Sequence, residues 1–120
     1  MDIQTYSKLA MRTVSPMPTA MLDIVHAAMG ISGEAGEVLD SVKKTMAYGK
    51  NLDRDHVVEE IGDCIFYMNM MVKFLDTTWD EVLDRNIRKL EARYPELKFS
   101  AERANNRDTD AEAAAMRGAA

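Results

Sequence analysis

Two pairs of acidic residues lie at equal distances on either side of one predicted turn. Glu34 and Glu37 precede the turn, Glu60 and Asp63 follow it, and both the inner and the outer partners are centred on residues 48–49. The members of each pair are three residues apart, which places them on one face of an α-helix, separated by a rise of about 4.5 Å. We therefore predict an antiparallel helical hairpin whose four carboxylates meet, with Glu37 level with Glu60.

The apolar residues elsewhere in the chain also predict helices. They recur at three- and four-residue steps, between segments rich in proline, glycine, aspartate or threonine. The expected helices cover about residues 3–14, 19–48, 53–75 and 79–93, with Asp53 or Asp55 and Thr77 or Thr78 as the N-caps of the last two. Only 7% of the residues are aromatic and ten are Met, a composition that suits helix packing. We expect an all-α protomer, a bundle of four to five helices.

The expected helix over 53–75 has apolar side chains in nearly every direction around its axis. Such a helix is buried on all sides, and a single chain of 120 residues has too few helices to surround it. We therefore expect a homo-oligomer, either a homodimer or a dimer of dimers.

The C-terminal segment has a different composition from the rest of the chain. Residues 1–99 are expected to form one domain, whereas residues 100–120 are polar and then alanine-rich without apolar periodicity. We interpret 100–120 as a mobile tail with some helical tendency.

The charge and hydropathy of the chain bear on its binding partners and its location in the cell. The net charge of -5 argues against a nucleic-acid binder, which needs a basic surface. The most apolar run, 61–75, is interrupted by polar residues and is too short to cross a bilayer. Cys64 is the single cysteine, and the N-terminal sequence lacks the apolar stretch of a signal peptide. We expect a cytoplasmic protein that binds neither nucleic acid nor membrane.

Four carboxylates held together repel one another, by about 4 kcal/mol for a pair 4 Å apart at an effective dielectric constant near 20. Either some are protonated, with raised pKa values, or hard divalent cations bind among them. An all-oxygen site suits Mg²⁺ or Mn²⁺. The competing interpretation is a solvated acidic helix face. Asp63 favours the metal site, because it interrupts an apolar run where an unpaired charge is costly.

Histidine is not expected among the metal ligands. Di-iron helix bundles use Glu-x-x-His pairs, and no histidine follows any of the four acidic residues at that spacing. His26 and His56 are interpreted as single histidines without a ligand partner at helical spacing, and His26 as a core or pocket-wall residue.

With its two motifs, Glu34-Ala35-Gly36-Glu37 and Glu60-Ile61-Gly62-Asp63, the sequence resembles the MazG-like all-α nucleoside triphosphate pyrophosphatases. The resemblance covers roughly residues 20–95 and includes the surrounding GEAGEVLD and EEIGDCIFYM. It implies that Glu34, Glu37, Glu60 and Asp63 are Mg²⁺ ligands. It also implies hydrolysis of a nucleoside triphosphate to the monophosphate and pyrophosphate, an activity suited to cleansing the nucleotide pool.

The family also has a downstream Asn-x-x-Lys-x-x-x-Arg element, matched by Asn86, Lys89 and Arg93. The resemblance implies that these residues hold the substrate, whereas on their own Lys89 and Arg93 are ordinary cations near a helix C-terminus. Lys44, seven residues after Glu37, lies on nearly the same helix face and is a candidate for contacting a distal phosphate.

In the mechanism that we expect, Glu37 or Glu60 accepts the proton of the attacking water. Two alternatives remain open. One is a non-catalytic helical module that binds a structural cation or a partner, and the other is an enzyme similar to phosphoribosyl-ATP pyrophosphatase.

Overall fold

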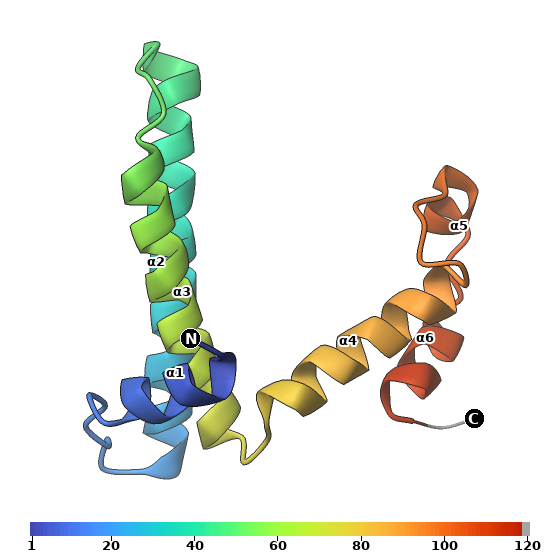
Figure 1. Cartoon of the computed structure of the whole chain (residues 1–120), viewed down its shortest axis with the longest axis horizontal. Coiled ribbons are helices and arrows are strands. Elements are labelled where there is room, and N and C mark those ends of the chain that lie inside the picture. The colour runs from blue at the N-terminus through green and yellow to red at the C-terminus, as the bar shows by residue number, and fades with distance from the viewer. Residues whose placement is uncertain (119–120) are drawn as a thin grey trace. The chain divides into compact units, whose positions relative to one another are not determined.

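The structure, a computed structural model, describes residues 1–118, and within them every regular element is an α-helix (Figure 1). The helices are α1 (Ile3–Met11), α2 (Ala20–Tyr48), α3 (Arg54–Phe74), α4 (Trp79–Arg93), α5 (Ala101–Asn105) and α6 (Thr109–Met116). The all-α fold class is confirmed. The described helices number six, rather than four or five, because α5 and α6 form where we expected a tail.

Polar caps fix where the helices begin. Thr19 accepts a hydrogen bond of 3.2 Å from the backbone N–H of Leu22 at the start of α2. Asp53, rather than Asp55, caps α3, and Thr78, rather than Thr77, caps α4. Each cap satisfies a backbone donor that the first helical turn leaves unpaired, which explains why these starts follow from the sequence.

The contacts within the chain divide it into two units, Met1–Thr77 and the segment from Thr78 onward. In the first unit α2 and α3 lie side by side along much of their length and are joined by the short segment 49–53 (Figure 1). Gly49 ends α2 with φ +64°, a left-handed conformation that glycine adopts without a steric cost. The helix α1 packs against α3. Together these helices place both acidic pairs in the first unit.

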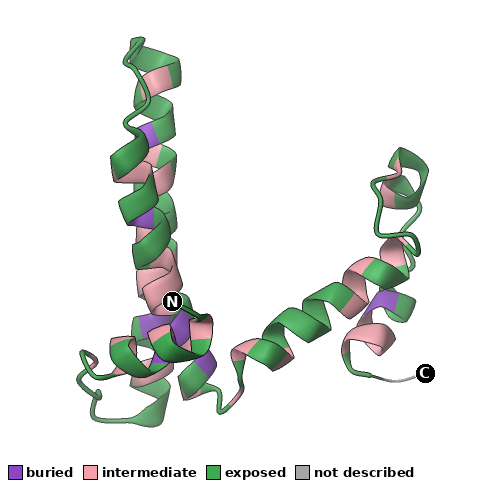
Figure 2. Cartoon of the chain, in the orientation of Figure 1, coloured by how far each residue is buried: buried purple, intermediate pink, exposed green. Residues whose placement is uncertain are grey.

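The core of the first unit is small, and buried residues gather where α1 meets the α2–α3 pair (Figure 2). Ala27 of α2 and Met70 of α3 are almost completely buried. Further along α2 and α3, apolar side chains are exposed; Met46, for example, is 82% exposed. We expected the residue 53–75 helix to be buried on all sides only within an oligomer, and in the single chain α3 exposes Val58 and Ile61. The homo-oligomer stays a prediction, and this apolar surface is compatible with it.

In the second unit α6 packs against α4, although its sequence shows almost no apolar periodicity. A buried charge lies at this contact: Glu112 of α6 is only 3% exposed and is paired with Arg93 of α4 and with Arg107. The residues of the expected tail up to 118 therefore include a helix packed on α4. The domain boundary that we expected at residue 99 stays a prediction, and the contacts divide the chain after Thr77 instead.

Within residues 1–118, no helix combines the length and the apolar composition needed to cross a membrane.

Candidate metal centre

Two overlapping groups of potential metal ligands lie between α2 and α3. Oxygen atoms of Glu34, Glu60 and Asp63 all lie within 4.8 Å of one another. A second group consists of Glu37, His56 and Glu60, again with one ligand atom from each residue within 4.8 Å of the others. The four acidic residues are thus distributed over two groups that share Glu60, and a histidine belongs to one of them.

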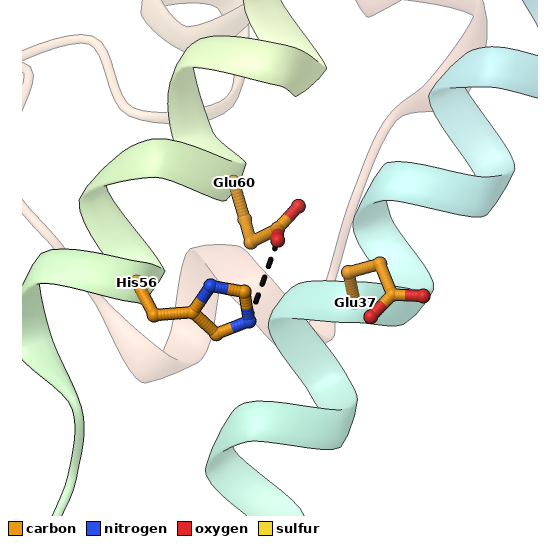
Figure 3. Close-up of side chains that lie close together, drawn as sticks. All are labelled: Glu37, His56 and Glu60. Atoms are coloured by element: carbon orange, nitrogen blue, oxygen red, sulfur yellow. Dashed lines mark ion pairs between the residues drawn. The ribbon is translucent and has the colours of Figure 1, made fainter.

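The histidine corrects our interpretation of the sequence. We considered His56 to lack a ligand partner at helical spacing, but it stands four residues before Glu60, one helical turn away. Its Nε2 lies 3.4 Å from Glu60 Oε1, and Figure 3 shows the imidazole directed toward that carboxylate. The Glu-x-x-His pattern covers only histidines that follow a glutamate, whereas helical neighbours lie in both directions along the chain.

Glu60 is the buried member of both groups, with only 7% of its surface exposed. We expected Asp63 to be the buried charge, but Asp63 is exposed. Residues three apart in an α-helix are rotated relative to one another about the helix axis, by roughly 60°. Glu60 is therefore buried, whereas Asp63 is exposed to solvent. Glu60 Oε2 has no hydrogen-bond partner among the described residues. Burial raises the pKa of Glu60, and a hydrogen bond with Glu34 adds to the rise, whereas the charge of His56 opposes it.

These residues fit a divalent cation. A buried carboxylate oxygen without a partner costs free energy that a bound cation would remove. Glu34, Glu60 and Asp63 offer only oxygen ligands, the donors that Mg²⁺ and Mn²⁺ prefer. Because Glu37 and Asp63 are exposed, the ligand groups are open to solvent, as a site that binds a substrate must be.

The glycines near the acidic residues differ in what surrounds them. A methyl group at Gly30 would overlap the ring of Tyr67, so the backbone of α2 and this ring are in close contact. A methyl group at Gly33, Gly36 or Gly62 would meet nothing within 4 Å. Only Gly30 is therefore required for packing in the first unit, and the other three leave open surface beside the carboxylates.

The wall of a cavity of about 340 Å³ includes His26 and Tyr67, whose rings lie edge to face with centroids 6.0 Å apart. Phe66 and Met70 line the same cavity. His26 therefore lies in a pocket wall, one of the two positions that we expected, but it is exposed and does not belong to the core.

Lys44 is paired with Asp40 on the same helix, its Nζ 2.7 Å from Asp40 Oδ2. Lys43 approaches the other carboxylate oxygen at 3.2 Å. The hydrogen bond to Asp40 raises the pKa of Lys44, which therefore keeps its charge. A phosphate would have to draw Lys44 away from Asp40, and the role of Lys44 in binding substrate stays a prediction.

The other predicted substrate residues, Asn86, Lys89 and Arg93, all lie on α4, in the second unit. Arg93 donates hydrogen bonds to both carboxylate oxygens of Glu112, and Arg107, five residues before Glu112, does the same. We did not predict Glu112 as the partner of Arg93, because no local spacing relates residues that are 19 positions apart.

Comparison with known proteins gives two matches. The family model described as "MazG nucleotide pyrophosphohydrolase domain" matches residues 26–98, a range that contains both acidic pairs and the α4 residues. The chain is also 33% identical over 72 residues to the "Gene 37 protein" of Mycobacterium phage L5. That match covers 57% of this chain and 63% of the phage protein, so the chain spans less than two-thirds of that relative. No solved structure matches the chain.

Proposed function

The chain belongs to the MazG nucleotide pyrophosphohydrolase domain family, and from this premise we propose that it is a Mg²⁺-dependent nucleoside triphosphate pyrophosphohydrolase. Membership supports a pyrophosphohydrolase at the level of the family. Our proposal adds the substrate, a ribo- or deoxyribonucleoside triphosphate, and the products, its monophosphate and pyrophosphate. The reaction would serve to cleanse the nucleotide pool of the cytoplasm.

The single observation that supports this proposal most is the environment of Glu60. Its carboxylate is buried, one of its oxygens has no hydrogen-bond partner among the described residues, and it lies in both groups of ligand atoms. A solvated acidic face would expose this side chain to water instead. We propose that Glu34, Glu60 and Asp63 hold the metal, with Mn²⁺ as an alternative to Mg²⁺, and that Glu37 completes the ligand set.

The bound cation supplies charge neutralisation for the triphosphate and makes a water molecule more acidic. Glu37 is exposed, and in our proposal its carboxylate accepts the proton of the attacking water, with Glu60 as the alternative acceptor. The water oxygen forms a bond to the α-phosphorus while the bond to the bridging oxygen of the β-phosphate breaks. Pyrophosphate leaves with that electron pair.

We assign the phosphate contacts to Lys44, Asn86, Lys89 and Arg93. The guanidinium of Arg93 binds two oxygens of one carboxylate in the structure, and the same paired geometry suits two oxygens of a phosphate. We further propose that α2 and α3 act as an antiparallel hairpin within a homodimer or a dimer of dimers, in which the exposed apolar residues of both helices are covered. Nucleic acid and membrane are not among the proposed partners.

The experiment is a pyrophosphate-release assay with the eight common ribo- and deoxyribonucleoside triphosphates and phosphoribosyl-ATP, with and without Mg²⁺. The variant Glu60→Gln removes one charge from the buried site, and Glu59→Gln removes one from the neighbouring side chain, which is 71% exposed. We expect Glu60→Gln to lower kcat/KM by roughly 100- to 1,000-fold, corresponding to a loss of a few kcal/mol of metal-dependent stabilisation. Glu59→Gln should stay within about threefold of wild type.

Wild-type turnover by Glu60→Gln at saturating Mg²⁺ would refute the proposal. If none of the nucleotides released pyrophosphate, a helical module that binds a structural cation without catalysis would be the better description. If only phosphoribosyl-ATP were hydrolysed, the enzyme would be of the phosphoribosyl-ATP pyrophosphatase type.

A further inference from the structure

His56 lies on α3 one turn before Glu60, on the side that faces α2. The start of α3 is fixed by Asp53, whose carboxylate accepts a hydrogen bond of 3.0 Å from the backbone N–H of His56. The imidazole is directed toward Glu60, and Glu37 lies on the neighbouring helix α2 (Figure 3). A nitrogen and two carboxylate oxygens, from two different helices, are thus brought within 4.8 Å of one another.

This spacing is close to that of ligands on one ion. Metal–ligand distances of about 2.0–2.2 Å place neighbouring ligand atoms roughly 3–3.5 Å apart. Because the three atoms already lie within 4.8 Å of one another, each pair needs to approach by no more than about 2 Å to reach that separation. An independent observation points to a ligand, because Glu60 is more than nine-tenths buried and its Oε2 lacks a hydrogen-bond partner among residues 1–118.

We propose that Glu37, His56 and Glu60 form a second cation subsite, which binds a divalent first-row transition metal in preference to Mg²⁺. This inference rests on the metal centre of the proposed function and deepens it. Glu60 bridges the two subsites. The subsite of Glu34, Glu60 and Asp63 has only oxygen donors, whereas the imidazole nitrogen of His56 gives its own subsite a softer donor.

The donor chemistry sets the preference. Mg²⁺ strongly favours oxygen ligands, whereas imidazole suits later transition metals, whose affinity for such sites rises from Mn²⁺ through Co²⁺ and Ni²⁺. The His56 side chain is 40% exposed, so a hydrated ion can reach it from solvent. The other histidine, His26, lies against Tyr67 and belongs to neither ligand group, so it serves as an internal control.

The test is calorimetric titration of the full chain with Co²⁺ and, separately, with Mg²⁺. We compare wild type with His56→Gln and with the control His26→Gln. We expect His56→Gln to weaken Co²⁺ binding by at least roughly 10- to 100-fold, because loss of even an outer-shell partner of a metal ligand commonly costs that much affinity. Its Mg²⁺ affinity should stay within about twofold of wild type. The control should change neither affinity.

A spectroscopic measurement on the Co²⁺-loaded protein identifies the ligand directly. Coordinated imidazole gives a strongly shifted, exchangeable N–H proton resonance, which should be present in wild type and in His26→Gln and absent in His56→Gln. The variant Glu37→Gln should also weaken Co²⁺ binding, which keeps the proposal testable if His56→Gln fails to fold by circular dichroism. Unchanged Co²⁺ affinity in Glu37→Gln, or a retained shifted resonance in His56→Gln, would overturn the inference.

The two proposals can fail separately. If Co²⁺ binding requires His56 but no nucleotide is hydrolysed, the subsite is supported and the proposed enzyme is not. If hydrolysis depends on Mg²⁺ and Glu60 while His56→Gln binds Co²⁺ as wild type does, the enzyme is supported. His56 would then be only an ion-pair partner of Glu60.

Discussion

Arg93 binds Glu112 through two hydrogen bonds, each 3.0 Å long, that join the end of α4 to α6. Arg107 binds the same carboxylate, with its shorter contact at 2.6 Å. The two guanidinium groups hold the pKa of Glu112 far below its usual range. The arginine that the family motif assigns to substrate is therefore already bonded to an anion of this chain, and a phosphate would compete with Glu112 for it.

The two arginines should separate binding of substrate from packing of α6. Both contact Glu112, but only Arg93 belongs to the family motif. We expect Arg93→Ala to lower kcat/KM by about 10- to 100-fold, since a hydrogen bond to a charged group contributes about 1.5–3 kcal/mol. Arg107→Ala should lower the melting temperature with little change in kcat/KM. Equal losses of kcat/KM in the two variants would indicate that Arg93 acts only through Glu112.

The contact between α4 and α6 should depend on pH through Glu112. A carboxylate with a lowered pKa in the folded state stabilises the fold above its ordinary value of 4.5, and this contribution is lost as the pH falls toward the folded-state pKa. The difference in free energy of unfolding between wild type and Glu112→Gln should therefore be constant above pH 5 and shrink from about pH 4.5 to pH 2. Urea unfolding at several pH values measures it. A difference that does not change with pH would contradict the assignment.

Gly30 and Gly33 form a matched pair, because both lie within α2 but only Gly30 contacts Tyr67. Gly30→Ala forces a methyl group into the ring and should cost about 1–3 kcal/mol of stability. Gly33→Ala meets open space and should stabilise the helix by about 0.5–1 kcal/mol. Urea unfolding of both variants at pH 7 measures the change in the free energy of unfolding, which should be negative for Gly30→Ala and positive for Gly33→Ala. A destabilised Gly33→Ala would mean that another surface covers this position.

Removing the charge of Glu60 should stabilise the protein when no metal is present. The buried carboxylate has an unpaired oxygen and a raised pKa, so its ionised form is unfavourable in the folded state. We expect Glu60→Gln to raise the melting temperature in EDTA by a few degrees, although the same variant loses most of its activity with Mg²⁺. A lower melting temperature would show that the ion pair with His56 outweighs the cost of burial.

Mg²⁺ should stabilise the wild-type protein by binding to the folded state. At a free concentration of 100 times Kd the gain is about 2.7 kcal/mol for one site, and EDTA should reverse it. Asp63→Asn, which removes a ligand that is exposed, should lower this gain without a large change in the metal-free melting temperature. Thermal melts over a series of Mg²⁺ concentrations test this expectation. A gain that is identical in Asp63→Asn would exclude Asp63 as a ligand.

Much of the helical framework could be predicted because its signals are local. A cap such as Thr78 acts within one turn of its helix, and the residue after it starts α4 as expected. The acidic motifs are also local, and their symmetrical placement about Gly49 was enough to predict that carboxylates from two helices meet. Burial was harder to predict, since it depends on which face of α3 meets α2, and Glu60 rather than Asp63 is covered.

The sequence by itself determined the first four helices, the turn at Gly49, the two acidic motifs and the family, because each depends on spacing over a few residues or on matching a pattern. Only the tertiary structure decided that His56 joins Glu37 and Glu60, and that Glu112 pairs with Arg93 and Arg107. These contacts join side chains from separate segments. Which side chains meet depends on how the helices pack, and the periodicity of residues along the chain does not predict that packing.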